Sequence, residues 1–126
     1  MLYIASPYSS GADPELMLKR YLDVRRFTAQ LLMNRVWCYS PIVHCHELAA
    51  KFTLPKDAEY WRSYNEHVLK RCDTLVVHKQ DGWDTSEGVR FEIDCAKANG
   101  LQIFSHYPST PVVTFIEDYK SKDLQL

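Results

Sequence analysis

The sequence DGWDTSEGVRFEIDCAKANG, residues 81–100, decides how the rest of the chain is organised. It follows the apolar run Thr74–Val77, which is typical of a buried strand. Its second half has a helical period, with Ser86 as the expected N-cap and Gly100 as the expected stop. We therefore expect a buried strand that ends in a polar loop, and a helix that begins directly after this loop.

Glu92 lies in the apolar stripe of that helix. Val89, Ile93 and Ala96 share one helical phase, which predicts the face that packs against a sheet, and Glu92 falls within it. An ionised carboxylate is costly to bury unless it has hydrogen-bond donors, a raised pKa or access to a ligand. Two interpretations stay open: a catalytic carboxylate at the floor of a pocket, and a structural carboxylate that reaches solvent or pairs with an arginine.

Composition limits the class of protein. The chain has 126 residues, 46% apolar and 25% charged, which fits one globular domain with a substantial core. A net charge of −1 leaves no electrostatic footprint for a nucleic-acid partner. Without a long apolar run or a signal-peptide pattern, we expect no membrane association and a cytoplasmic protein. The 4 cysteines form no Cys-x-x-Cys pair, so neither a zinc site nor a disulfide framework is expected.

Strands and helices alternate along the chain, as is typical of a parallel sheet with right-handed crossovers. We expect a single α/β domain over residues 1–120, with four to five parallel strands flanked by helices, and a frayed tail at 121–126. The expected strands are 1–5, 36–40, 74–77 and 101–104, and the expected helices are 13–34, 58–71, 86–100 and 112–119, with a loose helical turn at 49–53.

Three polar loops are expected to meet at the carboxyl ends of the strands, where open α/β sheets bind ligands. These loops are 6–11, 41–47 and 81–87. The first, rich in hydroxyls and free N–H groups, suits an anion. His44 and His46 are only two residues apart and no third ligand is positioned by the sequence, so we expect them to line a ligand crevice rather than bind a metal.

Four motifs together resemble the nucleoside 2-deoxyribosyltransferase superfamily: YIASPY at 3–8, SPIxH at 40–44, CDTLVV at 72–77 and DGWxxSxGVxxE at 81–92. The chain looks closest to a branch of short bacterial and phage proteins that mostly lack an assigned activity. The superfamily also includes N-glycosidases that act on nucleoside 5'-monophosphates. The resemblance implies a flavodoxin-like (Rossmann-like) fold, a nucleotide or nucleoside substrate, no metal or organic cofactor, and a homo-oligomer, for which Trp61, Tyr64 and the C-terminal segment are candidate contacts.

The resemblance also implies roles for individual residues. Glu92 matches the nucleophile that attacks C1' of the sugar, and Tyr3 matches the tyrosine that orients it, although Tyr3 could also be a core aromatic. Transferases acting on free nucleosides often carry Asp at the position of Ser86. A serine at this helix N-terminus brings no carboxylate that would repel the ligand, and it therefore suits a 5'-phosphate. The implied substrate-binding residues are Ser6, Tyr8, Ser9, His44, His46, Asp81, Gly82, Trp83, Ser86, Gly88 and Arg90.

Two positions depart from the family pattern. Asn65 stands where family enzymes usually carry a catalytic Asp, and an amide cannot act as an acid or base, so either Glu66 or Asp57 substitutes or the activity has drifted. Arg90 stands where close relatives tend to have Gly. The ranked hypotheses are an N-glycosidase or (deoxy)ribosyltransferase, a non-catalytic nucleotide-binding module, and a plain interaction protein.

Overall fold

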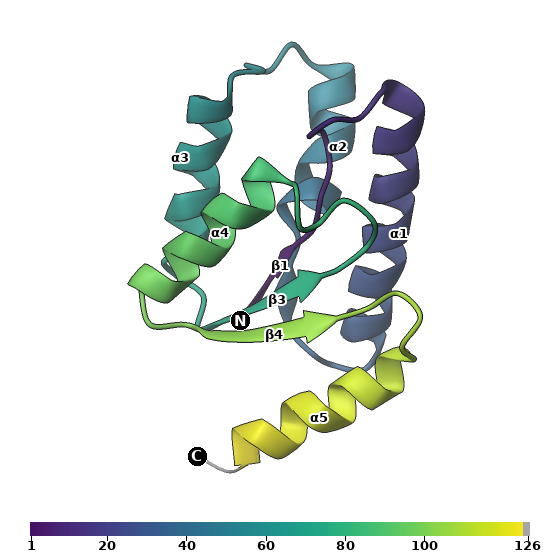
Figure 1. The fold of residues 1–126 in the computed structure, drawn as a ribbon, viewed down its shortest axis with the longest axis vertical. Coiled ribbons are helices and arrows are strands. Elements are labelled where there is room, and N and C mark those ends of the chain that lie inside the picture. The colour runs from purple at the N-terminus through teal and green to yellow at the C-terminus, as the bar shows by residue number, and fades with distance from the viewer. Residues whose placement is uncertain (125–126) are drawn as a thin grey trace.

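A parallel sheet with the strand order β2-β1-β3-β4 forms the centre of the computed structural model (Figure 1). The structure describes the backbone of residues 1–124 and the side chains of residues 1–121. The predicted α/β, flavodoxin-like fold class is confirmed. The strands are β1 (Leu2–Ala5), β2 (Cys38–Tyr39), β3 (Thr74–His78) and β4 (Gln102–His106). The helices are α1 (Pro14–Met33), α2 (Pro41–Lys51), α3 (Ala58–Leu69), α4 (Glu87–Ala98) and α5 (Val112–Leu124).

The alternating side chains of β1 build two separate cores. Leu2 and Ile4 pack on one face with residues of α1 and α5, whereas Tyr3 and Ala5 pack on the other with residues of α3 and α4. Successive strand side chains point to opposite faces, and β1 and β3 are buried along their whole lengths because helices cover both faces. The result is a three-layer sandwich in which Tyr3 faces α4.

Helix boundaries follow the capping residues. The Asp13 carboxylate accepts from the Leu16 amide (2.8 Å), and the Ser86 hydroxyl accepts from the Val89 amide (3.2 Å). Each of these bonds satisfies an amide that has no partner within its helix. Gly100 adopts φ of +72° directly after the end of α4. The expected cap at Ser86 and the expected stop at Gly100 are therefore confirmed.

The prediction for residues 41–53 was wrong, because this segment contains helix α2 rather than a polar loop and a loose turn. The Ser40 hydroxyl accepts from the Val43 amide at 3.2 Å, and Pro41 occupies the first helical turn. A serine N-cap followed by proline is a helix-start signal, since the fixed φ of proline suits that position. His44 and His46 therefore lie on a helix, and β2 is only Cys38–Tyr39.

The C-terminal elements run beyond their predicted ends. β4 continues to His106, and α5 continues to Leu124, into the segment predicted to fray. Residues 125–126 of that segment lie outside the described residues. None of the helices in the described part of the chain has the length and apolar character that crossing a membrane requires.

Arg20 joins two of the loops at the carboxyl edge of the sheet. Its guanidinium is buried, with 7% of the residue exposed, and donates from Nη1 to the carbonyls of Tyr8 (3.1 Å) and Ser10 (2.9 Å). The same guanidinium lies against Gly82, where a Cβ would collide with Nη2. A side chain from α1 therefore fixes both the loop after β1 and the loop after β3.

A row of aromatic rings closes the same edge under α1. His78 and His106 end β3 and β4 in register, and their Nδ1 atoms are 3.0 Å apart. Phe27 of α1 stacks on both rings, with centroid distances of 4.6 and 4.3 Å. Burial lowers the pKa of both histidines, while Asp23, 2.6 Å from His78 Nε2, opposes this for His78. The contact with His78 thereby holds the side chain of Asp23, a residue of α1, against the end of β3.

Gly82→Ala tests the contact with Arg20. Gly82 has φ of +95°, so an alanine there would be strained and would also meet the guanidinium. We expect a loss of about 2 kcal/mol in the free energy of unfolding, measured by urea denaturation. Gly11→Ala is the matched control, because Gly11 also has a positive φ (+62°) but open space around it. Equal losses in the two variants would show that Arg20 does not restrict position 82.

Candidate functional site

Glu92 and Tyr3 form a buried polar pair between α4 and the sheet. Only 5% of Glu92 is exposed, and Tyr3 is fully buried on β1. The Tyr3 hydroxyl donates a hydrogen bond to Glu92 Oε2. Glu92 thus points inward, as its place in the apolar stripe indicates, and the interpretation in which it pairs with an arginine is wrong, because the charged groups of the described chain form their ion pairs elsewhere.

Burial controls the protonation of this pair. Loss of solvation raises the pKa of Glu92 to about 8 from an ordinary value of 4.5, and the hydrogen bond from Tyr3 opposes part of this effect. Burial together with the nearby Glu92 carboxyl raises the pKa of Tyr3 well above 10. Tyr3 therefore remains a donor, while Glu92 changes charge near neutral pH.

Asn65 presents a buried amide oxygen that has no hydrogen-bond partner among the described residues. Such an atom costs about 1–3 kcal/mol unless a bound molecule donates to it. On the same helix, the Tyr64 hydroxyl lies 2.8 Å from the Tyr39 hydroxyl, and the Tyr39 ring lies 6.2 Å from the Tyr3 ring. A row of tyrosines therefore runs from Glu92 toward α3, the helix that carries Asn65.

The two acidic residues that could replace the missing Asp at position 65 are both engaged within α3. Glu66 forms an ion pair with Lys70 at 2.9 Å, one helical turn away. Asp57 caps the helix by accepting from the Tyr60 amide at 3.0 Å, and it is exposed. Neither carboxylate contacts Glu92 or Tyr3 through a hydrogen bond.

The N-terminus of α4 is open at Gly88. A Cβ added there would meet only the Ser86 hydroxyl oxygen, at the ordinary contact distance of 3.8 Å. Arg90, two residues further along, is also exposed. Ser86 itself is buried and satisfies the amide of Val89. The first turn of α4 thus offers backbone donors, a positive dipole end and space beside Gly88.

The loop after β1 uses its side chains mainly for internal contacts. The Ser6 hydroxyl accepts from Gln80 Nε2 at 2.8 Å and donates to the His78 carbonyl at 3.4 Å, so it is engaged within the protein. The Tyr8 hydroxyl lies 2.6 Å from His46 Nδ1. Ser9 is exposed. This loop is thereby attached to β3, to α2 and, through Arg20, to α1.

The two histidines of α2 have different surroundings. His46 stacks on Tyr21 of α1 at 3.9 Å, and burial lowers its pKa. His44 is exposed and lies 5.7 Å from the Tyr39 ring. Within the described residues, no group of three His, Cys, Asp or Glu side chains has the arrangement that a metal ion requires.

The loop after β3 contributes three of the predicted residues. Asp81 is exposed, and Gly82 passes over Arg20. Trp83 is half-buried against the core on the α4 side of the sheet, and the Lys79 ammonium lies 4.3 Å above its ring. The predicted site residues therefore fall into a buried pair at Glu92, an open helix end at Gly88, and a contact between Tyr8 and His46.

The sequence patterns did not predict the buried Arg20 or the row formed by Asp23, His78 and His106. Arg20 occupies the buried stripe of α1 with Val24, Phe27 and Leu31, so the signal that singled out Glu92 was present there too. His78 closes an apolar strand, which is also a visible signal. Its partner Asp23 is 55 residues away in sequence and could not be identified locally.

The raised pKa of Glu92 predicts how stability varies with pH. Because the folded pKa of about 8 exceeds the ordinary value of 4.5, the folded state binds more protons in this window, and stability falls as pH rises through it. Relative to Glu92→Gln, the wild type should lose about 3 kcal/mol of unfolding free energy between pH 5 and pH 8. Urea denaturation of both proteins measures this difference, and a difference independent of pH would contradict the raised pKa.

Comparison with known proteins gives a family for the chain. No curated protein matched it. A family model described as a domain of unknown function, DUF1937, matches residues 1–107. This range contains all four strands of the sheet and the residues Tyr3, Asn65 and Glu92. The chain therefore belongs to the DUF1937 family.

Proposed function

We propose that the chain cleaves the N-glycosidic bond of a nucleoside 5'-monophosphate, as its resemblance to the nucleoside 2-deoxyribosyltransferase superfamily implies. The observation that carries the proposal is the buried Glu92 carboxyl with the Tyr3 hydroxyl as its donor. A carboxylate with a raised pKa is poorly solvated once ionised, which favours attack on a carbon that is developing positive charge. Glu92 also lies one turn after Gly88, at whose end of α4 the backbone donors suit an anion.

The reaction has two steps. Ionised Glu92 attacks C1', the C1'–N bond breaks, and the base departs with the bonding electrons and takes up a proton from solvent. Water or a second base then attacks C1' and gives up a proton to solvent, the glycosyl ester opens, and the Glu92 carboxylate is restored. Tyr3 keeps its proton throughout because its own pKa is raised, so it orients the carboxyl by donating to one of its oxygens.

The first turn of α4 is the proposed phosphate position. Backbone N–H groups and the helix dipole favour an anion there, and Gly88 leaves room for it. Exposed Arg90 adds a positive charge at the end of this first turn. Ser86 supports the site as the cap of α4 and brings no negative charge, in contrast to an Asp at the same position.

A second candidate, a nucleotide-binding module without catalysis, is favoured by two observations. Asn65 cannot protonate a departing base, and its possible substitutes Glu66 and Asp57 are engaged within α3. Glu92 is also nearly enclosed, so a substrate reaches it only when neighbouring side chains move. The orphaned Asn65 oxygen suits a hydrogen bond from a bound sugar or base in either candidate.

Release of free base from a panel of nucleoside and deoxynucleoside 5'-monophosphates tests the proposal. We expect turnover that Glu92→Gln reduces by at least about 1,000-fold and that Tyr3→Phe reduces by about 10- to 100-fold. Because Glu92 must be ionised to attack, kcat/KM should rise with pH through a step near 8. Turnover equal to that of Glu92→Gln would exclude catalysis, and calorimetric binding without turnover would establish the second candidate.

Gly88→Ala separates the ligand site from the fold. A methyl group has space at this position in the free protein, and alanine is the better helix former, so we expect a gain of about 0.5–1 kcal/mol in unfolding free energy. The same methyl group would crowd a phosphate on the first turn of α4, and nucleotide affinity should fall about tenfold or more. Unchanged affinity by calorimetry would place the phosphate elsewhere.

A further inference from the structure

Asp23, His78, His106 and the Thr110 carbonyl form a continuous row of contacts, called here the histidine row, which the proposed reaction does not use. Asp23 Oδ1 lies 2.6 Å from His78 Nε2, and the Nδ1 atoms of His78 and His106 are 3.0 Å apart. At the other end, His106 Nε2 lies 2.9 Å from the Thr110 carbonyl oxygen. Both rings are buried, with 1% of His78 and 3% of His106 exposed. The row therefore joins α1, the ends of β3 and β4, and the segment 107–111 that leads into α5.

The histidine row contains more contacts than two neutral imidazoles can satisfy. Each of its three contacts needs one hydrogen between the facing atoms, and the groups at its two ends, a carboxylate and a carbonyl, are acceptors that supply none. A neutral imidazole carries a single ring N–H, so the two rings together provide two hydrogens. The three contacts therefore require one further proton, which resides on a ring because imidazole is a stronger base than a carboxylate.

Loss of the extra proton leaves one contact without a hydrogen. His78 keeps its Nε2–H on Asp23, because a hydrogen bond to a carboxylate is stronger than one between neutral groups. The two rings cannot separate, since they end neighbouring strands in register and Phe27 stacks on both. His106 then holds its only hydrogen at Nδ1, against His78, and its bare Nε2 faces the Thr110 carbonyl. The contact that opens is therefore the one to Thr110.

The segment held by this contact lies at the surface. Tyr107, Pro108 and Ser109 are exposed, and Thr110 is half-buried. A carbonyl on such a segment can turn to water and regain the hydrogen bond that it loses. The strands stay paired, because the Lys79 amide donates to the backbone carbonyl that follows the His106 ring, at 2.7 Å. The opening is thus confined to the segment 107–111.

We propose that the histidine row is a pH-sensitive switch, in which one proton shared by His78 and His106 decides whether the segment 107–111 is held against β4. With this proton bound, all three contacts are closed, and without it the Thr110 carbonyl is released. Burial lowers the pKa of both rings, so the proton leaves below the ordinary histidine value of 6.5 and the segment is released at neutral pH. This proposal does not depend on the proposed function.

Few charged groups act on the two rings from the elements packed around them. Besides burial, the largest effects on the pKa values come from Asp23, which raises that of His78, and from the Thr110 carbonyl, which raises that of His106. α5 presents the uncharged Phe115 ring, 5.7 Å from His106. The Lys79 ammonium, next to His78 in sequence, lies over the rings of two other aromatic residues, Trp83 and Tyr107. Within the described residues, Asp23 is therefore the carboxylate that stabilises the extra proton.

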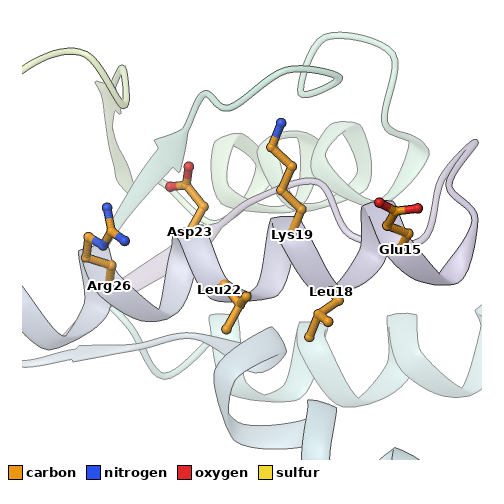
Figure 2. A pocket seen from close by; sticks show the side chains of 6 residues that line it. All are labelled: Glu15, Leu18, Lys19, Leu22, Asp23 and Arg26. Atoms are coloured by element: carbon orange, nitrogen blue, oxygen red, sulfur yellow. The ribbon is translucent and has the colours of Figure 1, made fainter.

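Asp23 also connects the buried rings to solvent. Its side chain is 39% exposed and lines a groove of about 390 Å³ on α1 (Figure 2). The other charged residues that line this groove are Glu15, Lys19 and Arg26. In Figure 2 the side chains of Lys19, Asp23 and Arg26 project from the same side of the helix. A proton can therefore reach His78 through Asp23 without disruption of the core.

Asp23→Asn removes the need for the extra proton without removing a contact. The asparagine amide can donate from Nδ2 to His78 Nε2, so His78 donates from Nδ1 to His106, and His106 donates from Nε2 to Thr110. All three contacts are then closed with neutral rings. In this variant the segment 107–111 should stay held at neutral pH as well as at acid pH.

NMR of ¹⁵N-labelled histidine rings in the full chain tests the switch between about pH 4.5 and pH 8. The wild type should show three protonated ring nitrogens in His78 and His106 at the acid end and two at the upper end, with one shared midpoint below 6.5. Asp23→Asn should show two over the whole range, because no carboxylate neutralises a third ring proton. His106→Gln assigns the signals.

Amide hydrogen exchange of residues 107–111 measures the release. At the upper pH these amides should exchange about tenfold faster in the wild type than in Asp23→Asn, and at the acid end the two proteins should match. Asp94→Asn is the matched control and should behave as the wild type, because Asp94 is exposed on α4, across the sheet from α1. Circular dichroism checks the fold of each variant, and the wild-type titration needs no variant.

The proposal is overturned by any of three results. The first is a third ring proton that is absent at the acid end or retained at the upper end of the titration. The second is a separate midpoint for each of the two rings. The third is equal exchange of residues 107–111 in the wild type and in Asp23→Asn at the upper pH.

Discussion

The hydrogen bond from the Tyr3 hydroxyl to the Glu92 carboxyl joins the sheet to α4 where water is excluded. It depends on the pairing register of β1. Leu2 and Ile4 face α1 and α5, so Tyr3 must face α4, and a shift by one residue would turn it away and leave the carboxyl without its donor. The apolar pattern of a four-residue strand thereby determines whether a buried acid is tolerated.

Two buried ionisable side chains, Glu92 and Arg20, lie on opposite faces of the sheet. Glu92 lies on the α4 side and accepts from a hydroxyl. Arg20 lies on the α1 side and donates from Nη1 to two loop carbonyls, while its buried Nε has no hydrogen-bond partner among the described residues. Arg20 positions the loops that carry Tyr8 and Gly82, and the α4 cap at Ser86 follows directly from the second loop. The carboxyl edge of the sheet is therefore held by polar contacts.

Local patterns in the sequence predicted most of this architecture. Apolar periodicity predicted α1, α3, α4 and the strands, because each of these elements has to bury one face. The same periodicity predicted that Glu92 points toward the sheet. The cap at Ser86 was predicted because its hydrogen bond spans only three residues. Helix α2 was missed because Pro41 can end a strand or begin a helix, and the strand interpretation overlooked the cap at Ser40.

Long-range partners could not be predicted in this way. The contact of His78 with Asp23, the position of Arg20 under Gly82, and the orphaned oxygen of Asn65 depend on how separate elements pack. No local pattern encodes those distances. The resemblance supplied roles for Glu92, Tyr3 and Asn65, while the burial and the altered pKa of Glu92 come from the packed structure.

Glu92 is a buried carboxyl whose only hydrogen-bond donor among the described residues is the Tyr3 hydroxyl, and the raised pKa of Glu92 depends on this environment. A pH titration of ¹³C-labelled glutamate side chains by NMR, with Glu92→Gln to assign the resonance, measures it most directly. A pKa of about 8 for Glu92 is the predicted result. A pKa near 4.5 would mean that the carboxyl is solvated or paired with a cation, and would contradict this description of the site.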